Sequence, residues 1–187
     1  MIVIETPRLF LLHFTLDDID ALADILGDHD NMRFFANRFE RKDAEDRIQK
    51  NLRRYAEDGV GQWALLLKPG KKFAGYCGLV RQEIDGNREI EVGYALARQA
   101  QGQGIATEAA RACMNYAFTT LGEDRVISLI RPENLPSRRV AERNGMAVEK
   151  ESEFVGLPHL VYVAHRPDSK VRTSIRDATR SDPFCLH

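Results

Sequence analysis

The feature that most constrains this chain is a glycine-rich turn between an apolar segment and an alanine-rich one, within residues 96–110. A strand pattern ends at Leu96, Gly102 and Gly104 follow, and a helical pattern begins at Ile105. The first amides of a helix have no partner inside it and carry the positive end of its dipole. Glycines let the backbone approach a ligand closely. The turn therefore predicts a cradle of main-chain N–H groups for a phosphate or pyrophosphate, without a lysine.

Taken alone, this pattern also fits an ordinary strand-to-helix turn, and both interpretations stay open. A P-loop requires a lysine and a hydroxyl residue after its last glycine, whereas Ile105 and Ala106 follow here. A dinucleotide fingerprint needs a third small residue and an acid at the end of the next strand. Thr107 holds the third position, and the strand-like run 126–130 is followed by Arg131. Both nucleotide motifs fit poorly.

Length and composition favour a single globular domain, because 187 residues with 43% hydrophobic and 29% charged content suffice for one core. A net charge of −1 gives no electrostatic reason to expect nucleic acid or a membrane as partner. No signal peptide or membrane-spanning run is visible, so we expect a cytoplasmic location. The three cysteines and five histidines are scattered, which predicts neither a disulfide framework nor a metal site.

Apolar periodicity and turn signals predict alternating strands and helices. We expect strands at 8–13, 62–67, 73–80, 89–96, 126–130, 147–154 and 160–164, and helices at 15–27, 43–58, 105–121 and 136–144. Along 89–96, apolar residues alternate with Glu89, Glu91 and Gly93, which predicts one buried and one polar face. We assign one domain to 1–165 and expect the polar tail, 166–187, to be loosely ordered.

Four motifs within residues 1–165 together resemble one known family. They are Ile4–Leu9, Glu91–Leu96, the run Gln101-x-x-Gly104-x-Ala106 continuing to Ala109, and Asn134-x-x-Ser137 with Ala141–Met146. In this order they are similar to the Gcn5-related N-acetyltransferases (GNAT), in the ribosomal-protein-alanine acetyltransferase (RimJ/RimL-like) branch. The resemblance implies an α/β (α+β) fold whose mixed, mostly antiparallel sheet has six or seven strands. That sheet would be splayed between its fourth and fifth strands and flanked by about four helices.

The resemblance also implies acetyl-CoA as co-substrate, with no metal. Amides of the glycine-rich turn would hold the pyrophosphate, the pantetheine arm would pair with the splayed strand edge, and Asn134 would bind the arm from the other side. The implied coenzyme-binding residues are Tyr94, Ala95, Leu96, Gln101, Gly102, Gln103, Gly104, Ile105, Ala106, Thr107 and Asn134. The alternative for Asn134 is a turn residue beside two prolines.

The implied reaction is direct attack of a primary amine on the thioester. An α-amino group has a pKa near 7.7–8.0, against about 10.4 for lysine, so a weak base suffices for an N-terminal acceptor. Glu91, on the polar side of the strand, is the candidate base, and Glu89 is its backup. The alternative for either glutamate is solvent exposure or pairing with an arginine such as Arg88.

Many relatives protonate the departing thiolate with a tyrosine on the helix after the fifth strand. Residues 135–145 contain no tyrosine, and Ser137 could supply the hydroxyl or could merely cap the helix. A main-chain N–H near Val92 could polarise the thioester carbonyl. Arg138 or Arg139 could meet the 3′-phosphate of the coenzyme.

The acceptor stays open between a protein N-terminus and a small-molecule amine, which could be a polyamine, an aminoglycoside or a small metabolite. We expect its contacts in residues 31–39 and 154–159, and a homodimer paired through the last strands is a further option. Two competing functions remain: a non-catalytic acyl-CoA-binding or sensing module, and a dinucleotide-binding oxidoreductase.

Overall fold

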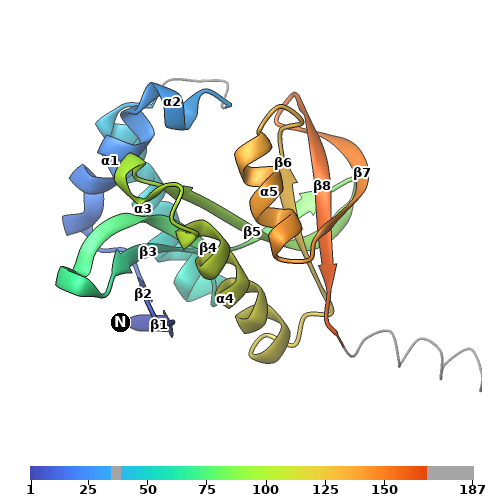
Figure 1. The fold of residues 1–187 in the computed structure, drawn as a ribbon, viewed down its shortest axis with the longest axis horizontal. Coiled ribbons are helices and arrows are strands. Elements are labelled where there is room, and N and C mark those ends of the chain that lie inside the picture. Colours follow the sequence, from blue (N-terminus) through green and yellow to red (C-terminus); the bar gives the residue numbers. More distant parts are fainter. Residues whose placement is uncertain (35–38, 168–187) are drawn as a thin grey trace, which may run out of the picture.

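The computed structural model describes residues 1–34 and 39–167, which form one sheet covered by helices (Figure 1). Its strand order is β1-β2-β3-β4-β5-β6-β8-β7, and only β5 and β6 run parallel. The strands are β1 (Ile2–Glu5), β2 (Leu9–Leu12), β3 (Gln62–Leu67), β4 (Lys72–Ile84), β5 (Asn87–Leu96), β6 (Arg125–Ile130), β7 (Ala147–Phe154) and β8 (Leu157–His165). The predicted mixed, mostly antiparallel sheet is confirmed. It has eight strands because the short β1 pairs with β2 as a hairpin.

Five α-helices lie in the described part of the chain, one more than expected. They are α1 (Ile19–Gly27), α2 (His29–Met32), α3 (Arg41–Glu57), α4 (Ile105–Thr119) and α5 (Leu135–Arg143). The unpredicted α2 is a single turn, whose first amides donate to the Asp28 carboxylate. Of the predicted tail, residues 168–187 lie outside the described part of the chain, as do residues 35–38 of the expected acceptor segment.

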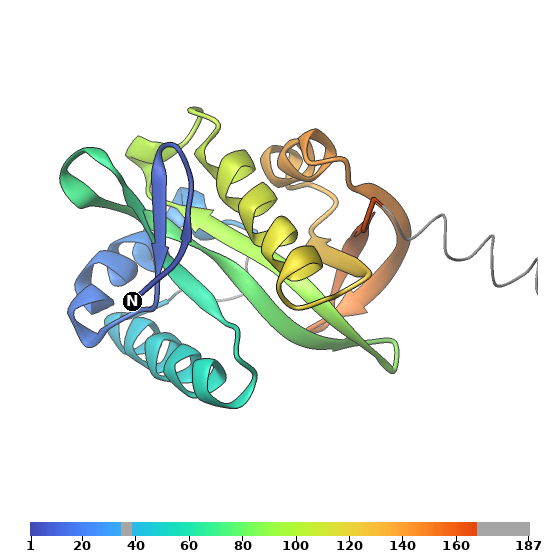
Figure 2. The same cartoon turned by 90° about the horizontal axis from the view of Figure 1, so that it is seen from below.

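The two faces of the sheet carry separate apolar cores. On one face α4 lies across the strands (Figure 2), and its Ala109 and Cys113 join Trp63 and Val92 in the larger core. On the other face α1 and α3 pack through Leu22 and Ile48. The side chains of β5 therefore alternate between the α4 face and the α3 face, and Glu91 and Gly93 lie on the α3 face.

The sheet is splayed between β5 and β6, as predicted. These strands pair only at Glu91 and Ile127, so β5 continues beyond its last partner. In Figure 1, β6–β8 and α5 accordingly form an arm apart from α1–α3. A sheet with one parallel pair also differs from the doubly wound parallel sheet of dinucleotide-binding folds, which counts against the oxidoreductase alternative.

Candidate functional site

The first element of the site is the edge of β5 that faces the splay. The amide of Leu79 on β4 donates to the carbonyl of Gly61, the residue before β3. The partner of Leu79 on β5, Val92, therefore directs its main chain away from β4 and toward β6. The Ser128 hydroxyl on β6 donates to the Val92 carbonyl at 3.0 Å. By strand alternation the main chain of Tyr94 points the same way, two residues beyond the last bridge. The open edge therefore begins at Tyr94, past Val92, whereas the Leu96 carbonyl accepts from the Asn31 and Gln101 side chains, each at 3.2 Å.

The glycine-rich turn leads directly into α4, with Gly104 as its left-handed N-cap (φ 75°). The amide of Glu108 donates to the Gly104 carbonyl at 3.1 Å. Because this bond is the first of the helix, the amides of Ile105, Ala106 and Thr107 have no acceptor within it. Residues 101–104 are exposed to solvent. Main-chain donors at the positive end of a helix fit a diphosphate.

Side chains of the turn bind protein rather than pointing into the cradle. The Gln101 amide nitrogen donates to Asn31 Oδ1 at 2.6 Å and to the Leu96 carbonyl at 3.2 Å. The Gln103 side chain donates to the carbonyl of Gln99 at 2.7 Å. These contacts hold the turn against β5 and α2. The main-chain amide of Gln101 donates to the Arg98 carbonyl at 3.2 Å, so only the amides from Gly102 onward can meet a ligand.

Glu91 is partly buried on the α3 face beside the splay. Its carboxylate accepts from the Gln82 side chain at 2.9 Å and from the Leu129 amide. Burial raises the pKa of Glu91, and these two hydrogen bonds and the positive charge of Arg54 oppose the shift. A carboxylate with a raised pKa is a better proton acceptor near neutral pH.

Glu89, the backup base, has a different environment. The Arg125 guanidinium lies 2.9 Å from its carboxylate and also binds Glu149. The pairing alternative for Glu89 is thus the one observed, although its partner is Arg125 rather than Arg88. Glu89 therefore takes part in an ion-pair network that joins β5 to β6 and β7.

A hollow that the sequence pattern did not indicate lies above Gly93. A Cβ placed on Gly93 would be 3.8 Å from Gln62 Nε2 and 4.0 Å from Glu91 Oε1, with no closer neighbour. The space over Gly93, between these two side chains and next to the candidate base, therefore has room for a methyl group in ordinary van der Waals contact. A signal was available, since Gly93 is the only residue without a side chain in the polar alternation of β5.

Across the splay, α5 presents Asn134 and Ser137. The Asn134 side chain is the N-cap and accepts the Ser137 amide at 3.2 Å. The cap is thus Asn134, and within residues 1–34 and 39–167 the Ser137 hydroxyl has no hydrogen-bond partner. The Tyr94 hydroxyl donates to the Ser137 carbonyl at 3.1 Å, which joins β5 to α5.

The two candidate 3′-phosphate ligands differ in their surroundings. The Arg138 guanidinium donates to the Tyr162 hydroxyl and to the Pro132 carbonyl, at 3.1 and 3.0 Å. Arg139 is exposed. The Arg138 side chain therefore holds α5 against β8 through the Tyr162 hydroxyl.

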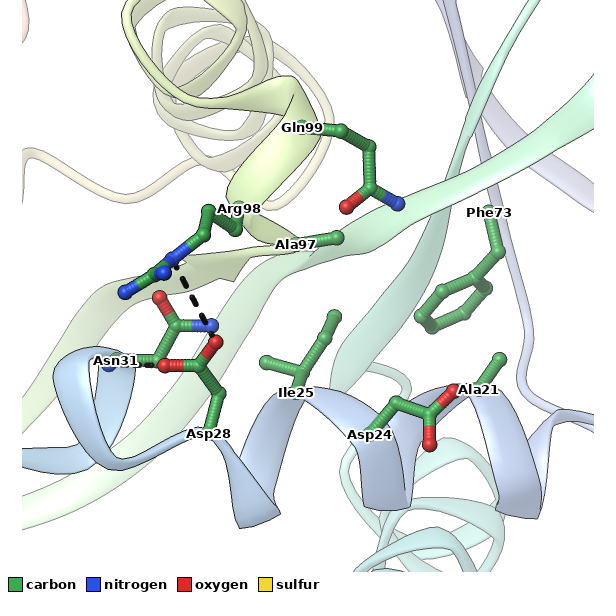
Figure 3. A pocket seen from close by; sticks show the side chains of 9 residues that line it. All are labelled: Ala21, Asp24, Ile25, Asp28, Asn31, Phe73, Ala97, Arg98 and Gln99. Atoms are coloured by element: carbon green, nitrogen blue, oxygen red, sulfur yellow. Dashed lines mark hydrogen bonds and ion pairs between the residues drawn. The ribbon is translucent and has the colours of Figure 1, made fainter.

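A cavity of about 200 Å³ lies between α1 and the segment that follows β5 (Figure 3). Asn31, from the expected acceptor segment, lines it together with Asp28 and Arg98, and the Arg98 guanidinium is turned toward Asp28 at 3.8 Å. None of the predicted coenzyme-binding or catalytic residues lines this cavity. The other expected acceptor segment, 154–159, forms the β7–β8 turn, where the Phe154 and His159 rings meet edge to face.

No helix in the described part of the chain combines the length and apolar character of a membrane span. Within the same residues, no three His, Cys, Asp or Glu side chains are grouped so that they could hold a metal ion.

Comparison with known proteins gives matches over most of the chain. The acetyltransferase (GNAT) domain model matches residues 8–147. The uncharacterized protein YkkB of Bacillus subtilis (strain 168) is 34% identical over 78% of this chain and 85% of its own length. A GNAT-family acetyltransferase from Bacillus anthracis superposes with a TM-score of 0.75 at 24% identity, covering 88% of this chain and 98% of that one. RimL, a ribosomal L7/L12 α-N-protein acetyltransferase in complex with coenzyme A, superposes with a TM-score of 0.71 at 18% identity, covering 88% and 98%.

Proposed function

The chain belongs to the GNAT acetyltransferase family, and on that premise we propose that it moves the acetyl group of acetyl-CoA directly to a primary amine. The single observation that carries the proposal is the arrangement of β5. Within four residues, this strand offers a partly buried carboxylate, Glu91, on one side and the unpaired main chain of Tyr94 on another. A coenzyme arm and an acceptor amine could therefore approach the same point from different directions.

The coenzyme would be held mainly by the protein backbone. Amides of residues 102–107 would bind the pyrophosphate, with the Gln101 side chain holding the turn in place. The amides of the pantetheine arm would pair with the edge of Tyr94, Ala95 and Leu96 as an added strand. The side-chain oxygen of Asn134, Oδ1, caps the helix, which leaves the side-chain NH₂ group of Asn134 to donate to the pantetheine arm. Acetyl-CoA supplies an activated acetyl thioester.

Two side chains would handle protons. Glu91 would accept a proton from the attacking amine, directly or through a water, because burial raises its pKa toward the working range of a base. Ser137 would donate its hydroxyl to the departing sulfur, since that hydroxyl has no other partner in residues 1–34 and 39–167. In α5 the cap position belongs to Asn134, which supports this role for Ser137.

A protein N-terminal α-amine fits this machinery better than a lysine. About one α-amine in ten is neutral at pH 7, against fewer than one lysine in a thousand, so a single carboxylate is an adequate base. RimL, whose fold this chain shares, is described as acting on the α-N position of a ribosomal protein, which supports the same choice by analogy.

The test is release of coenzyme A thiol from acetyl-CoA against a panel of small amines and N-terminal peptides. We expect thiol release that depends on the amine and an acetylated product of the corresponding mass. Tight acetyl-CoA binding with no turnover for any amine would instead indicate the non-catalytic sensing module. Fluorescence titration showing NADH binding in preference to acetyl-CoA would overturn the coenzyme assignment.

A further inference from the structure

We propose that the acceptor carries a negatively charged group close to its amine, and that a stripe of cations on α3, formed by Arg47, Lys50 and Arg54, recognises it. The inference rests on the proposed function and narrows it to anionic amines. The shared chemistry is a carboxylate or phosphate beside a primary amine, from a free amino-acid-like metabolite or from an acidic N-terminal peptide.

Helix α3 is fixed beside the Gly93 hollow by two contacts to one residue of β3. The buried Asn51 side chain accepts the Gln62 amide at 2.7 Å, and the Tyr55 hydroxyl donates to the Gln62 carbonyl. Because both main-chain groups of Gln62 are bound to α3, the helix cannot shift along the strand without breaking them. The Gln62 side chain is also one wall of the hollow.

The three cations share one side of α3. Their spacing of three and four residues places them on adjacent turns of the same face. Arg47 lies 3.4 Å from Gln62 Oε1 and donates to the Tyr76 hydroxyl at 2.7 Å. Arg54 is close enough to Glu91 for their charges to interact. The stripe thus begins at the wall of the hollow and reaches the candidate base.

The positive charge of this stripe is not neutralised by ion pairing. Among residues 1–34 and 39–167, no carboxylate lies within salt-bridge distance of Arg47, Lys50 or Arg54. Repulsion from Arg54 lowers the pKa of Lys50, and partial burial, Arg47 and Arg53 add to the effect. Burial is also the main reason that the pKa of Arg54 is lowered, although Asp58 and Glu91 oppose this shift.

Such a stripe favours one acceptor charge over the other. An anionic group would gain charge-assisted hydrogen bonds and relieve the repulsion among the three cations. A polyamine or an aminoglycoside would bring further positive charge to the same place and be rejected. Nearby cations also lower the pKa of an incoming ammonium group, so more of the acceptor is in the neutral form that attacks the thioester.

The experiment compares acceptors of matched size that differ in charge, with kcat/KM expressed per neutral amine, because a carboxylate also raises the pKa of the neighbouring amine. One pair is an α-amino acid and its carboxamide; the other is a peptide with Asp at its second position and the same peptide with Asn. We expect wild-type kcat/KM to be about 10- to 100-fold higher for the anionic member of at least one pair. A preference in the first pair alone identifies a metabolite-like acceptor, and one in the second pair alone identifies an acidic N-terminus.

Two variants then assign the preference to α3. We expect Lys50→Glu and Arg54→Gln each to reduce the ratio of anionic to neutral kcat/KM about 10-fold or more. Lys42→Glu is the matched control, because Lys42 is an exposed cation on the same helix outside the stripe; it should leave the ratio unchanged. Thiol release with no charge preference, or an equal loss in the control, would overturn the inference while leaving acetyl transfer intact. Absence of thiol release with every acceptor would overturn both.

Discussion

Arg8 and Glu108, one hundred residues apart in the sequence, form an ion pair with 2.5 Å between Nε and Oε2. The Glu108 carboxylate also accepts the Thr6 hydroxyl at 2.6 Å, while Arg8 donates a second time, to the Gln103 carbonyl at 2.9 Å. The segment after β1 is thereby joined to the first turn of α4 and to the glycine-rich turn. The motif Ile4–Leu9 thus has a structural reason: it supports the amides that we assign to the coenzyme.

Replacing Glu108 by Ala should weaken coenzyme binding as well as the fold. We expect KM for acetyl-CoA to rise about five-fold and the free energy of unfolding to fall by about 1 kcal/mol, because the pair is partly exposed. Glu123→Ala is the matched control: its ion pair with Arg81 has similar exposure but lies away from the turn. Steady-state kinetics and thermal denaturation measure both effects. An equal rise in KM for the control would contradict the assignment.

The Glu108 contribution should also depend on pH. Partial burial pushes its pKa upward, but hydrogen bonds from Thr6 and Arg8 prevail and hold it below the ordinary 4.5. A lowered carboxyl pKa stabilises the protein above the unfolded pKa, and this stability is lost as pH falls through the folded pKa. The melting temperatures of wild type and Glu108→Ala should therefore converge below about pH 4.5. If the difference in melting temperature between wild type and Glu108→Ala stayed constant down to pH 3, the ion pair would not be the source of the stability that Glu108 contributes.

Glu91→Gln should separate catalysis from stability. As the base is lost, we expect kcat to fall about 100-fold or more, and the acid limb of the pH–rate profile to disappear. In the wild type that limb should lie above pH 4.5, because burial raises the pKa of Glu91. The stability associated with a raised carboxyl pKa is present below the unfolded pKa and lost as pH rises through the folded pKa. At pH 7 the variant should therefore be at least as stable as wild type.

The control for this prediction is Glu89→Gln, which removes a carboxylate from the same strand. Because Glu89 pairs with Arg125, we expect a lower melting temperature and a nearly unchanged kcat. If Glu89→Gln lost activity as steeply as Glu91→Gln, the assignment of the base to Glu91 would be wrong.

Ser128→Ala should loosen β5 just before the open edge. The Val92 carbonyl would lose its hydroxyl donor in a buried setting, which we expect to cost about 1–2 kcal/mol of unfolding free energy. KM for acetyl-CoA should rise, because the main chain of Tyr94 follows two residues later. Ser152→Ala is the control, because the hydrogen bond that it removes, from Ser152 to Asp85, is exposed to solvent. Its unfolding free energy and its KM for acetyl-CoA should change little. Denaturant unfolding and coenzyme titration distinguish the two variants.

Much of this architecture was predictable because the longer strands and helices show a regular period of apolar residues. The alternation of apolar and polar residues predicted β5 and placed Glu91 on its polar face. The family resemblance carried by the four motifs implied the splay between β5 and β6. Two short elements were missed: β1, with four residues, and α2, with a single turn. Elements this short have too few positions for a period to be visible.

Contacts between distant segments could not be predicted in the same way. That Glu89 is bound by Arg125, while Glu91 is bound by Gln82, depends on which strands lie side by side. The nearness of Arg54 to Glu91 depends likewise on how α3 is held on Gln62. Such differences arise from tertiary packing and decide which of two similar carboxylates can act as the base.

Gly93→Ala should fill the hollow beside Glu91 without disturbing the fold. Its added Cβ would meet Gln62 and Glu91 at 3.8 and 4.0 Å, which are ordinary van der Waals distances. We expect a melting temperature equal to or slightly above that of wild type, since replacing glycine restricts the unfolded chain. The acceptor would lose its space, so kcat/KM for the amine should fall about 10-fold, and further in Gly93→Val.

Gly27→Ala is the matched control, because a Cβ there has no neighbour within 4 Å and the position is far along the chain from β5. It should leave turnover unchanged. Gly75→Ala gives the contrast, since its Cβ would lie 2.2 Å from the Ala95 carbonyl oxygen at a φ of 143°, and it should fail to fold. A well-folded Gly93→Ala protein with wild-type turnover would mean that the acceptor does not occupy this hollow, and that the amine reaches Glu91 from another side.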